Sequence, residues 1–282
     1  MKKNRKHLQS FLLWGMAVIL LLPVYILIDG SLQSSDELME SLAPVLADAN
    51  TNVDWHILPL YPTLVHYLEA LFDRPEFYAM LKNSLQIVFF TLFGQLVIGV
   101  PSAWAFSRFR FPGKNFIFLV YMILMMMPFS VTMFSTYLVL KRLSLFNSLW
   151  GIILPGMFSA FPVFIIFRGF EAIPKGMLEA ARIDGAGELM VFFRIGLPLG
   201  SAGISSAVIL SFLEYYSLME QPLAFLEDRA LWPLSLYLPN IGLEEAGYAF
   251  AAGIVALIPA FLVFFLGQDY LEKGIVASGM KE

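Results

Sequence analysis

The sequence of 282 residues contains no cysteine, and only 14% of its residues are charged. The absence of cysteine excludes disulfide bonds and thiolate metal sites, and it leaves the redox compartment open. The scarcity of charge separates the chain from ordinary soluble domains, in which about a quarter of the residues are charged. The basic residues are scattered and do not alternate with aromatic ones, so the sequence does not indicate nucleic-acid binding.

Motifs that carry chemistry are also missing. The phosphate-binding pattern GxxxxGK[ST] does not occur, because its nearest fragment, Gly113-Lys114-Asn115, lacks the leading glycine and the hydroxyl residue. No Ser/His/Asp grouping and no metal-ligand spacing stands out, so we predict neither catalytic residues nor a metal site. The three histidines, His7, His56 and His66, lie outside the apolar runs and are interpreted as surface residues.

Apolar residues dominate the composition, at 59% of the chain with a mean hydropathy of +0.73. A helix needs roughly 20 apolar residues to cross a bilayer. Runs of that length with at most one charged residue are Leu8–Ile28, Ser84–Phe106, Phe116–Leu140, Ser148–Phe167, Leu197–Met219 and Ala246–Gly267. They show no strict period-two alternation, which argues against strands. We therefore predict an all-α integral membrane protein with six transmembrane helices.

The first run could instead be a cleaved signal peptide, because the basic segment MKKNRKH precedes it. We favour an uncleaved helix, since the run is longer than a usual signal core and no A-x-A site follows.

Lysine and arginine near the ends of spans set the orientation of a membrane protein. With a cytoplasmic N-terminus, the inner segments carry Lys2, Lys3, Arg5, Lys6, Arg108, Arg110, Lys114, Arg168, Lys175, Arg182, Arg194, Lys273 and Lys281. The outer segments carry only Arg74, Lys82, Lys141, Arg142 and Arg229. Both termini are therefore predicted to be cytoplasmic. The chain divides into the N-terminus with the first helix (1–28), an extracytoplasmic segment (29–79), a five-helix core (80–270) and a cytoplasmic tail (271–282).

The longest inner loop, Arg168–Gly196, has a sequence typical of ordered structure. Pro174 suits the first turn of a helix, and good helix formers follow over Lys175–Asp184. Gly185 falls where a left-handed C-terminal cap is expected. A second short helix is predicted over Glu188–Ile195, and Gly196-Leu197-Pro198 should break the chain before it re-enters the membrane. Apolar side chains outside the bilayer indicate a partner protein, although a helix lying on lipid headgroups is the alternative.

The same loop resembles the EAA loop of ABC importer permeases. Glu179-Ala180-Ala181, Gly185, Ile195 and Leu197-Pro198 match every fixed position of that pattern with its spacing. In this family the short helix is a coupling helix that sits in a groove of a separate ATPase. The resemblance therefore implies that the ATPase-coupling residues are Glu179, Ala180, Ala181, Asp184, Gly185, Ile195, Leu197 and Pro198.

The resemblance extends along nearly the whole chain. AWAFSRFRFPGKN at 103–115, LFNSLWGIILP at 145–155 and FRGFEAIPKGMLEAARIDGA at 167–186 are similar to the smaller, six-span subunit of maltose-type sugar importers. It implies a type I importer permease in the bacterial cell membrane (plasma or inner membrane) that forms half of a sugar path by alternating access. Its implied partners are a second permease in a heterodimer, an ATPase dimer that holds ATP and Mg²⁺, and an extracytoplasmic solute-binding protein. This chain itself would bind no cofactor and would not be an enzyme.

Residues for the translocation path are less clearly marked. Tyr216 and Ser217 stand where many such subunits have a Trp-Asn pair. Glu214 is an ionisable residue within a span, where such residues usually face water or the bundle interior. It is a path candidate with Tyr215 and Tyr216, and a hydrated position near the outer rim is the alternative. Met127-Pro128 is a candidate helix break and gate, or flexible packing.

Other classes remain open on the sequence alone. An ion-coupled secondary transporter of a small solute could have six spans and a structured loop, but we see no convincing inverted repeat between the halves. A membrane-embedded enzyme lacks a catalytic grouping. An exporter subunit is disfavoured only by the resemblance.

Overall fold

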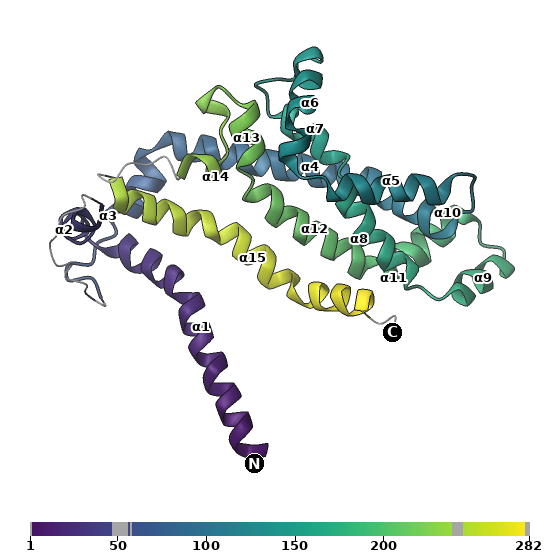
Figure 1. Ribbon diagram of the computed structural model, residues 1–282, viewed down its shortest axis with the longest axis horizontal. Helices are drawn as coiled ribbons and strands as arrows, with labels where there is room; N and C mark the ends of the chain where they lie inside the picture. Colours follow the sequence, from purple (N-terminus) through teal and green to yellow (C-terminus); the bar gives the residue numbers. More distant parts are fainter. Residues whose placement is uncertain (1, 47–55, 57, 239–244, 280–282) are drawn as a thin grey trace. The chain divides into compact units, whose positions relative to one another are not determined.

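Every regular element that the computed structural model describes is a helix, as Figure 1 shows. The described residues are 2–46, 56, 58–238 and 245–279. They form two units, one of residues 1–78 and 237–258 and the other of residues 79–236 and 259–282, and two long helices, α4 (Pro75–Arg108) and α15 (Ala246–Gly279), contribute residues to both. The first unit also contains α1 (Lys2–Leu32), α2 (Ser35–Leu46), α3 (Val65–Leu68) and a π-helical turn at Glu69–Asp73.

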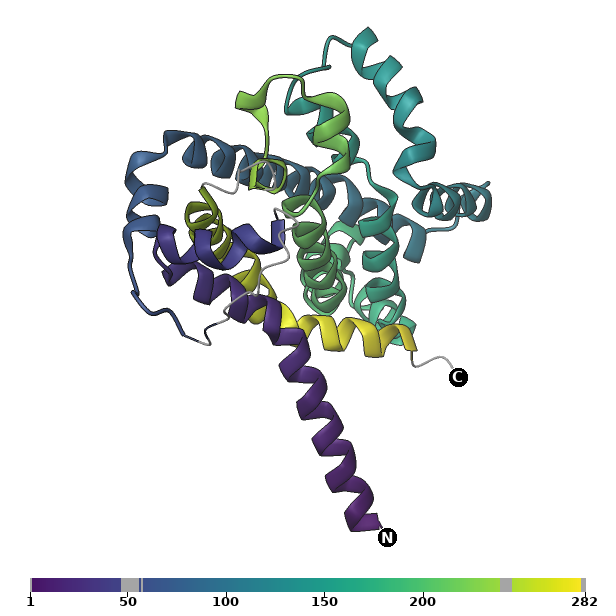
Figure 2. The same ribbon diagram turned by 60° about the vertical axis from the view of Figure 1, so that its left-hand side comes forward.

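The second unit holds the remaining helices, except for a single residue. They are α5 (Lys114–Met126), α6 (Phe129–Arg142), α7 (Trp150–Met157), α8 (Ala160–Glu171), α9 (Lys175–Ile183), α10 (Glu188–Val191), α11 (Leu197–Leu199), α12 (Ser201–Tyr216), α13 (Glu220–Phe225) and α14 (Leu234–Tyr237). The exception is Tyr237 at the end of α14, which belongs to the first unit. A π-helical turn, Phe192–Gly196, joins α10 to α11, and a 3-10 turn, Arg229–Leu231, precedes α14. Figure 2 shows the same chain after a turn of 60° about the vertical.

Four segments of the described chain are long and apolar enough to span a membrane: Leu12–Leu32, Pro75–Arg108, Trp150–Glu171 and Ala246–Leu271. Two bent pairs, α5 with α6 and α10–α11 with α12, would bring the number to six if each pair is one span. The predicted all-α membrane fold is therefore confirmed, with four continuous candidate spans and up to six if each bent pair counts as one.

The third predicted span, Phe116–Leu140, is not one straight helix. It ends at Met126, and α6 starts after a bend of 103°. Met127 is extended (φ −73°, ψ 121°), because the ring of Pro128 disfavours a helical backbone at the residue before it. The helix break that Met127-Pro128 predicts is thus present.

The fifth span also differs from the prediction. Gly196, Leu197 and Pro198 do not break the chain, because they continue as a π-helical turn and α11. Pro198 lies in the first turn of α11, where a missing N–H costs little. The bend of 65° comes instead at Gly200, between α11 and α12.

Glycines bring α8 and α12 into close contact within the second unit. A Cβ placed on Gly169 would lie 2.8 Å from the Cα of Gly203, and the reverse holds for Gly203. Membrane helices use small residues in this way, because backbones can then approach and gain dispersion contacts. Since α8 precedes the loop 168–196 and α12 follows it, this crossing fixes the two ends of the loop relative to each other.

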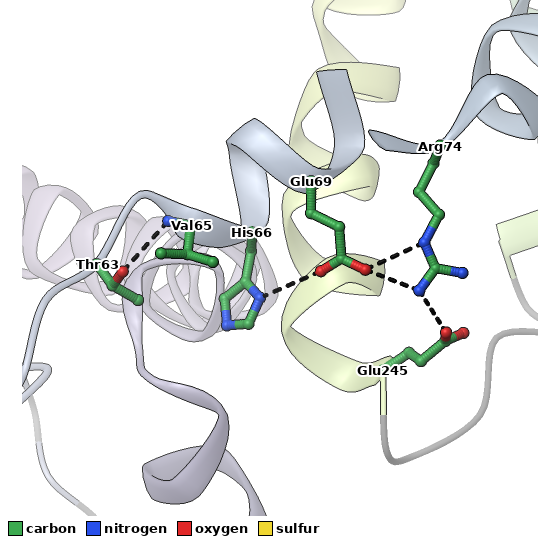
Figure 3. Close-up of polar contacts among 6 residues, drawn as sticks. All are labelled: Thr63, Val65, His66, Glu69, Arg74 and Glu245. Carbon is green, nitrogen blue, oxygen red and sulfur yellow. Dashed lines mark hydrogen bonds and ion pairs between the residues drawn. The ribbon is translucent and has the colours of Figure 1, made fainter. Parts of the chain in front are cut away.

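The first unit contains a cluster of charged residues, drawn in Figure 3. Arg74 lies between two carboxylates, with its Nη2 2.7 Å from Glu69 Oε1 and 2.5 Å from Glu245 Oε1. Hydrogen bonds to Glu245 and then Glu69 raise the pKa of the Arg74 guanidinium. His66 Nδ1 is 4.0 Å from Glu69 Oε2. The cluster ties the π-helical turn at Glu69–Asp73 to the residue before α15.

The prediction that all three histidines are surface residues is wrong for His66, which is only 5% exposed. A Cβ on Gly247 would lie 2.2 Å from His66 Nε2, so the imidazole fills the space left by that glycine. His56 is exposed as predicted, and the side chain of His7 lies outside the described residues.

Candidate functional site

The helix predicted at Lys175–Asp184 is present as α9, one residue shorter, with Asp184 as its C-cap. Pro174 lies just before it, as its N-cap (φ −58°, ψ 130°). Leu178 is the one α9 side chain that is fully buried, at 2% exposed, and it packs in a core cluster with Phe170, Ile173 and Trp104. Leu178 is therefore the main apolar anchor of α9, and most of the other side chains of the helix are exposed.

The C-terminus of α9 ends in the left-handed cap that the sequence predicts. Gly185 has φ +86°. A residue with a Cβ adopts this left-handed conformation only at a cost in free energy. The N–H of Gly185 donates to the carbonyl of Arg182, and the N–H of Ala186 donates to the carbonyl of Ala181, both at 3.0 Å. This pair of bonds is a Schellman motif, which satisfies carbonyls that the end of a helix would otherwise leave open.

An ion pair and buried packing hold α9 and the segment that leads back to the membrane in place. The guanidinium of Arg182 donates to both carboxylate oxygens of Glu188, at 2.7 and 3.1 Å. This contact raises the pKa of Arg182, and it joins α9 to the start of α10. Val191 on α10 is fully buried in the same core cluster as Leu178. A Cβ on Gly196 would lie 2.6 Å from the ring of Trp104, so the loop closes directly against α4.

The loop is consequently a folded element rather than a slack connection. It is anchored by buried side chains at Phe170, Ile173, Leu178 and Val191. It can transmit a displacement at its surface to α8, α4 and α12, because packed interiors deform little.

The residues of the EAA pattern divide into two groups. Glu179, Ala180, Asp184, Gly185 and Pro198 are exposed. Ala181, Ile195 and Leu197 are half-buried and pack against the core cluster of the second unit. The first group is available to another molecule, whereas the second group holds the loop in place.

The most exposed apolar side chains of the loop lie outside the pattern. Ile183 is 86% exposed and Leu189 is 75% exposed. Phe193 (60%), Met177 (49%) and Met190 (49%) are further exposed apolar side chains of the loop. Ile183 was missed by sequence reasoning, although a signal was available: it follows the anchor Leu178 by five positions, roughly 140° around a helix of 3.6 residues per turn. Two apolar residues so placed cannot both face the core.

The path candidates are placed differently from one another. Glu214, Met127 and Pro128 are exposed. Tyr216 is half-buried and stacks on Phe212, with ring centroids 5.4 Å apart. Tyr215 is only 5% exposed and packs in a core cluster with Ile87, Ile152 and Ile153. Tyr215 therefore does not line a surface of this chain, because the side chain points into the core beside Gly156.

Within the described residues, no group of three or more His, Asp or Glu side chains is arranged to hold a metal ion.

The sequence profile of one family, described as the inner membrane component of binding-protein-dependent transport systems, matches residues 95–277, more than half of the chain. The chain belongs to this family. The matched range includes the whole of the loop 168–196 and every predicted coupling residue of this permease. The resemblance to ABC importer permeases is confirmed, and the permease is a multi-pass membrane protein.

Relatives of this permease are transport permeases. It is 31% identical over 211 residues to the sn-glycerol-3-phosphate transport system permease protein UgpE of Yersinia pestis, across 73% of this chain and 75% of that protein. It is 26% identical over 289 residues to the arabinooligosaccharides transport system permease protein AraQ of Halalkalibacterium halodurans, across 100% of both chains.

A solved structure shows the same fold. It is a bacterial ABC transporter involved in the import of the acidic polysaccharide alginate, with a TM-score of 0.80 at 20% identity, over 95% of this chain and 96% of that one. The predicted importer permease fold is thereby confirmed.

Proposed function

We propose that this permease forms half of the translocation path for a sugar or oligosaccharide and is driven by a separate ATPase through the loop 168–196. The observation that carries the proposal is the exposed apolar surface of Ile183 and Leu189 on a loop that is anchored in the core. Exposed apolar area outside the membrane is stabilised when a partner covers it. The permeases UgpE and AraQ, named for glycerol phosphate and arabinooligosaccharides, support a polyol or sugar cargo.

The partners follow from the same proposal. A second permease completes the path as a heterodimer, and an ATPase dimer binds ATP and Mg²⁺. An extracytoplasmic solute-binding protein delivers the cargo, and the family description, which names binding-protein-dependent transport, supports this last partner. The loop and both termini face the cytoplasm, the segment 29–79 faces outward, and the membrane is the bacterial inner membrane. This chain itself holds no cofactor and performs no catalysis.

The mechanism we propose is alternating access. Closure of the ATPase pair by ATP moves α9, and the Schellman cap and the Arg182–Glu188 contact carry that motion to α10 as a rigid body. Buried Leu178 and Val191 pass it to the core that surrounds α8 and α4. ATP can drive this change only if it binds one conformation of the assembly more tightly than the other.

Reconstituted uptake tests the proposal against the ion-coupled alternative. Vesicles that contain the permease, its partner permease and the ATPase should take up sugar from the binding protein when ATP is present on the ATPase side. They should take up none with a proton or sodium gradient alone. Uptake by this chain alone, driven by a gradient without ATP, would assign it to the secondary transporters instead.

We also propose that Glu214 and Tyr216 line the path, with Met127 and Pro128 as a hinge, and we exclude Tyr215 because it is buried. Glu214 is the exposed ionisable residue on α12, and carboxylates and aromatic faces suit sugar hydroxyls and rings. In the same vesicles, Glu214→Gln should change the KM for uptake. An unchanged KM and rate would place Glu214 on the hydrated rim.

A further inference from the structure

A basic cavity lies beside α9 in the second unit, separate from the exposed apolar surface of the loop. Its volume is about 310 Å³. The residues that line it come from the end of α4, the start of α5 and the helix α9: Ser107, Arg108, Phe109, Arg110, Lys114, Lys175, Leu178, Glu179 and Arg182. Five of these are basic and one is acidic. Part of the positive charge is compensated, because Arg182 pairs with Glu188, but Arg110 and Lys175 are exposed cations.

Two residues that line this cavity each have a buried polar atom with no hydrogen-bond partner among the described residues. These atoms are Nε of Arg108 and Oγ of Ser107. The Nη2 atom of Arg108 is already used, because it donates to the carbonyls of Phe170 and Ile173 at the end of α8. A buried donor left without a partner costs about 1–3 kcal/mol. Because both atoms are covered by protein, an anion in the cavity would first meet the exposed cations Arg110 and Lys175.

The position of the cavity along the chain points to a lipid. Arg108 is the last residue of one candidate membrane span, and Lys114 is the first residue of another. Phe109 (42% exposed) and Phe116 (71% exposed) flank the basic residues, and Lys114 Nζ donates to the carbonyl of Phe109 at 3.1 Å. Cations and aromatic rings at the ends of spans lie at the level of the lipid headgroups. Basic pockets between helices at that level bind anionic headgroups.

We propose that this cavity binds the phosphate group of an anionic phospholipid. Arg110, Lys114 and Lys175 provide the donors, and the acyl chains extend along the apolar ends of α4 and α5. The lipid would join the ends of two spans to α9. It would thereby stabilise the position of the loop from the membrane side, and this goes beyond the proposed docking of the ATPase.

The test uses a double variant, Arg110→Gln with Lys175→Gln, in the complete transporter with its partner subunits. The matched control is Lys141→Gln with Arg142→Gln, which removes the same charge from exposed residues at the end of α6. Native mass spectrometry of the complex from nanodiscs containing phosphatidylglycerol and phosphatidylcholine measures the retained anionic lipid. Each cation near a lipid surface strengthens binding about fivefold, so the cavity variant should bind phosphatidylglycerol about 30-fold more weakly. The control should retain it as the wild type does.

Two results would overturn the proposal. One is equal retention of phosphatidylglycerol by the cavity variant, the control and the wild type. The other is displacement of the lipid by millimolar inorganic phosphate, which would make a free anion the ligand. Neither result affects the proposed function, because the same spectra report separately whether the ATPase remains bound to the permease. Loss of the ATPase from the wild-type complex would instead contradict the proposed coupling and leave the lipid measurement intact.

Discussion

A Gly185→Val variant is expected to insert and assemble but to lose most of its ATP-driven uptake. Gly185 has φ +86°, and in the part of the chain that the structure describes no neighbouring atom lies within 4 Å of where its Cβ would be. The substitution therefore acts through the backbone alone. A left-handed backbone costs about 1–2 kcal/mol for an ordinary residue, and branching at Cβ adds to this. That strain shifts the populations of the loop conformations by roughly five- to thirtyfold. Uptake should fall by a similar factor, while ATP hydrolysis continues without driving transport.

The loop contains its own controls for this experiment. Gly187 also has open space at its Cβ, but its backbone is extended (φ −68°, ψ 159°), so Gly187→Val should keep nearly full uptake. Gly185→Asn should fall between the two, because asparagine tolerates the left-handed region better than valine. If Gly185→Val transports as well as the wild type, the cap has no part in coupling.

A Gly203→Leu variant should fail to give a stable permease. The clash is with backbone, because a Cβ on Gly203 lies 2.8 Å from Gly169 Cα, and α8 cannot give way without separating from α12. Overpacking of this kind costs about 1–3 kcal/mol even for a small side chain, so Gly203→Ala should already lower the melting temperature. The larger leucine should remove most of the stability of a marginally stable fold.

Gly99 is the matched control for this crossing. A Cβ on Gly99 would contact Val163 Cγ2 at 3.6 Å, an ordinary packing distance, on another helix pair of the same unit. Gly99→Ala should leave the melting temperature within a few degrees of the wild type. Size-exclusion chromatography of detergent-solubilised, heated samples measures all three variants. A Gly203→Leu permease that melts with the wild type would show that the crossing is not a tight contact.

The loop was the part of the fold that the sequence predicted best, because its signals are local. Pro174, the run of helix formers after it and Gly185 specify where α9 begins and ends through backbone chemistry alone. The break at Met127-Pro128 is equally local, since a proline constrains the residue before it.

The features that sequence reasoning placed wrongly depend on contacts between distant segments. The bend at Gly200 accompanies the approach of Phe170, whose Cε1 would lie 2.4 Å from a Cβ at that position. His66 is buried against Gly247, and the two residues are far apart in the sequence. Tyr215 was grouped with Glu214 because the two are adjacent, yet neighbours on a helix point about 100° apart, and Tyr215 faces the core. Ile183 was overlooked because it lies between pattern residues without belonging to them.

The most direct test of the account is a cross-link from Ile183 to the ATPase. Because the chain contains no cysteine, Ile183→Cys provides a unique thiol in this subunit for a photoreactive maleimide. Leu143→Cys, at the end of α6, is the control, with the native side chain 62% exposed compared with 86% for Ile183. We expect a cross-link between the residue-183 variant and the ATPase subunit, and none from residue 143. A residue-183 probe that labels only lipid in the assembled transporter would contradict it, because α9 would then lie on headgroups rather than on an ATPase.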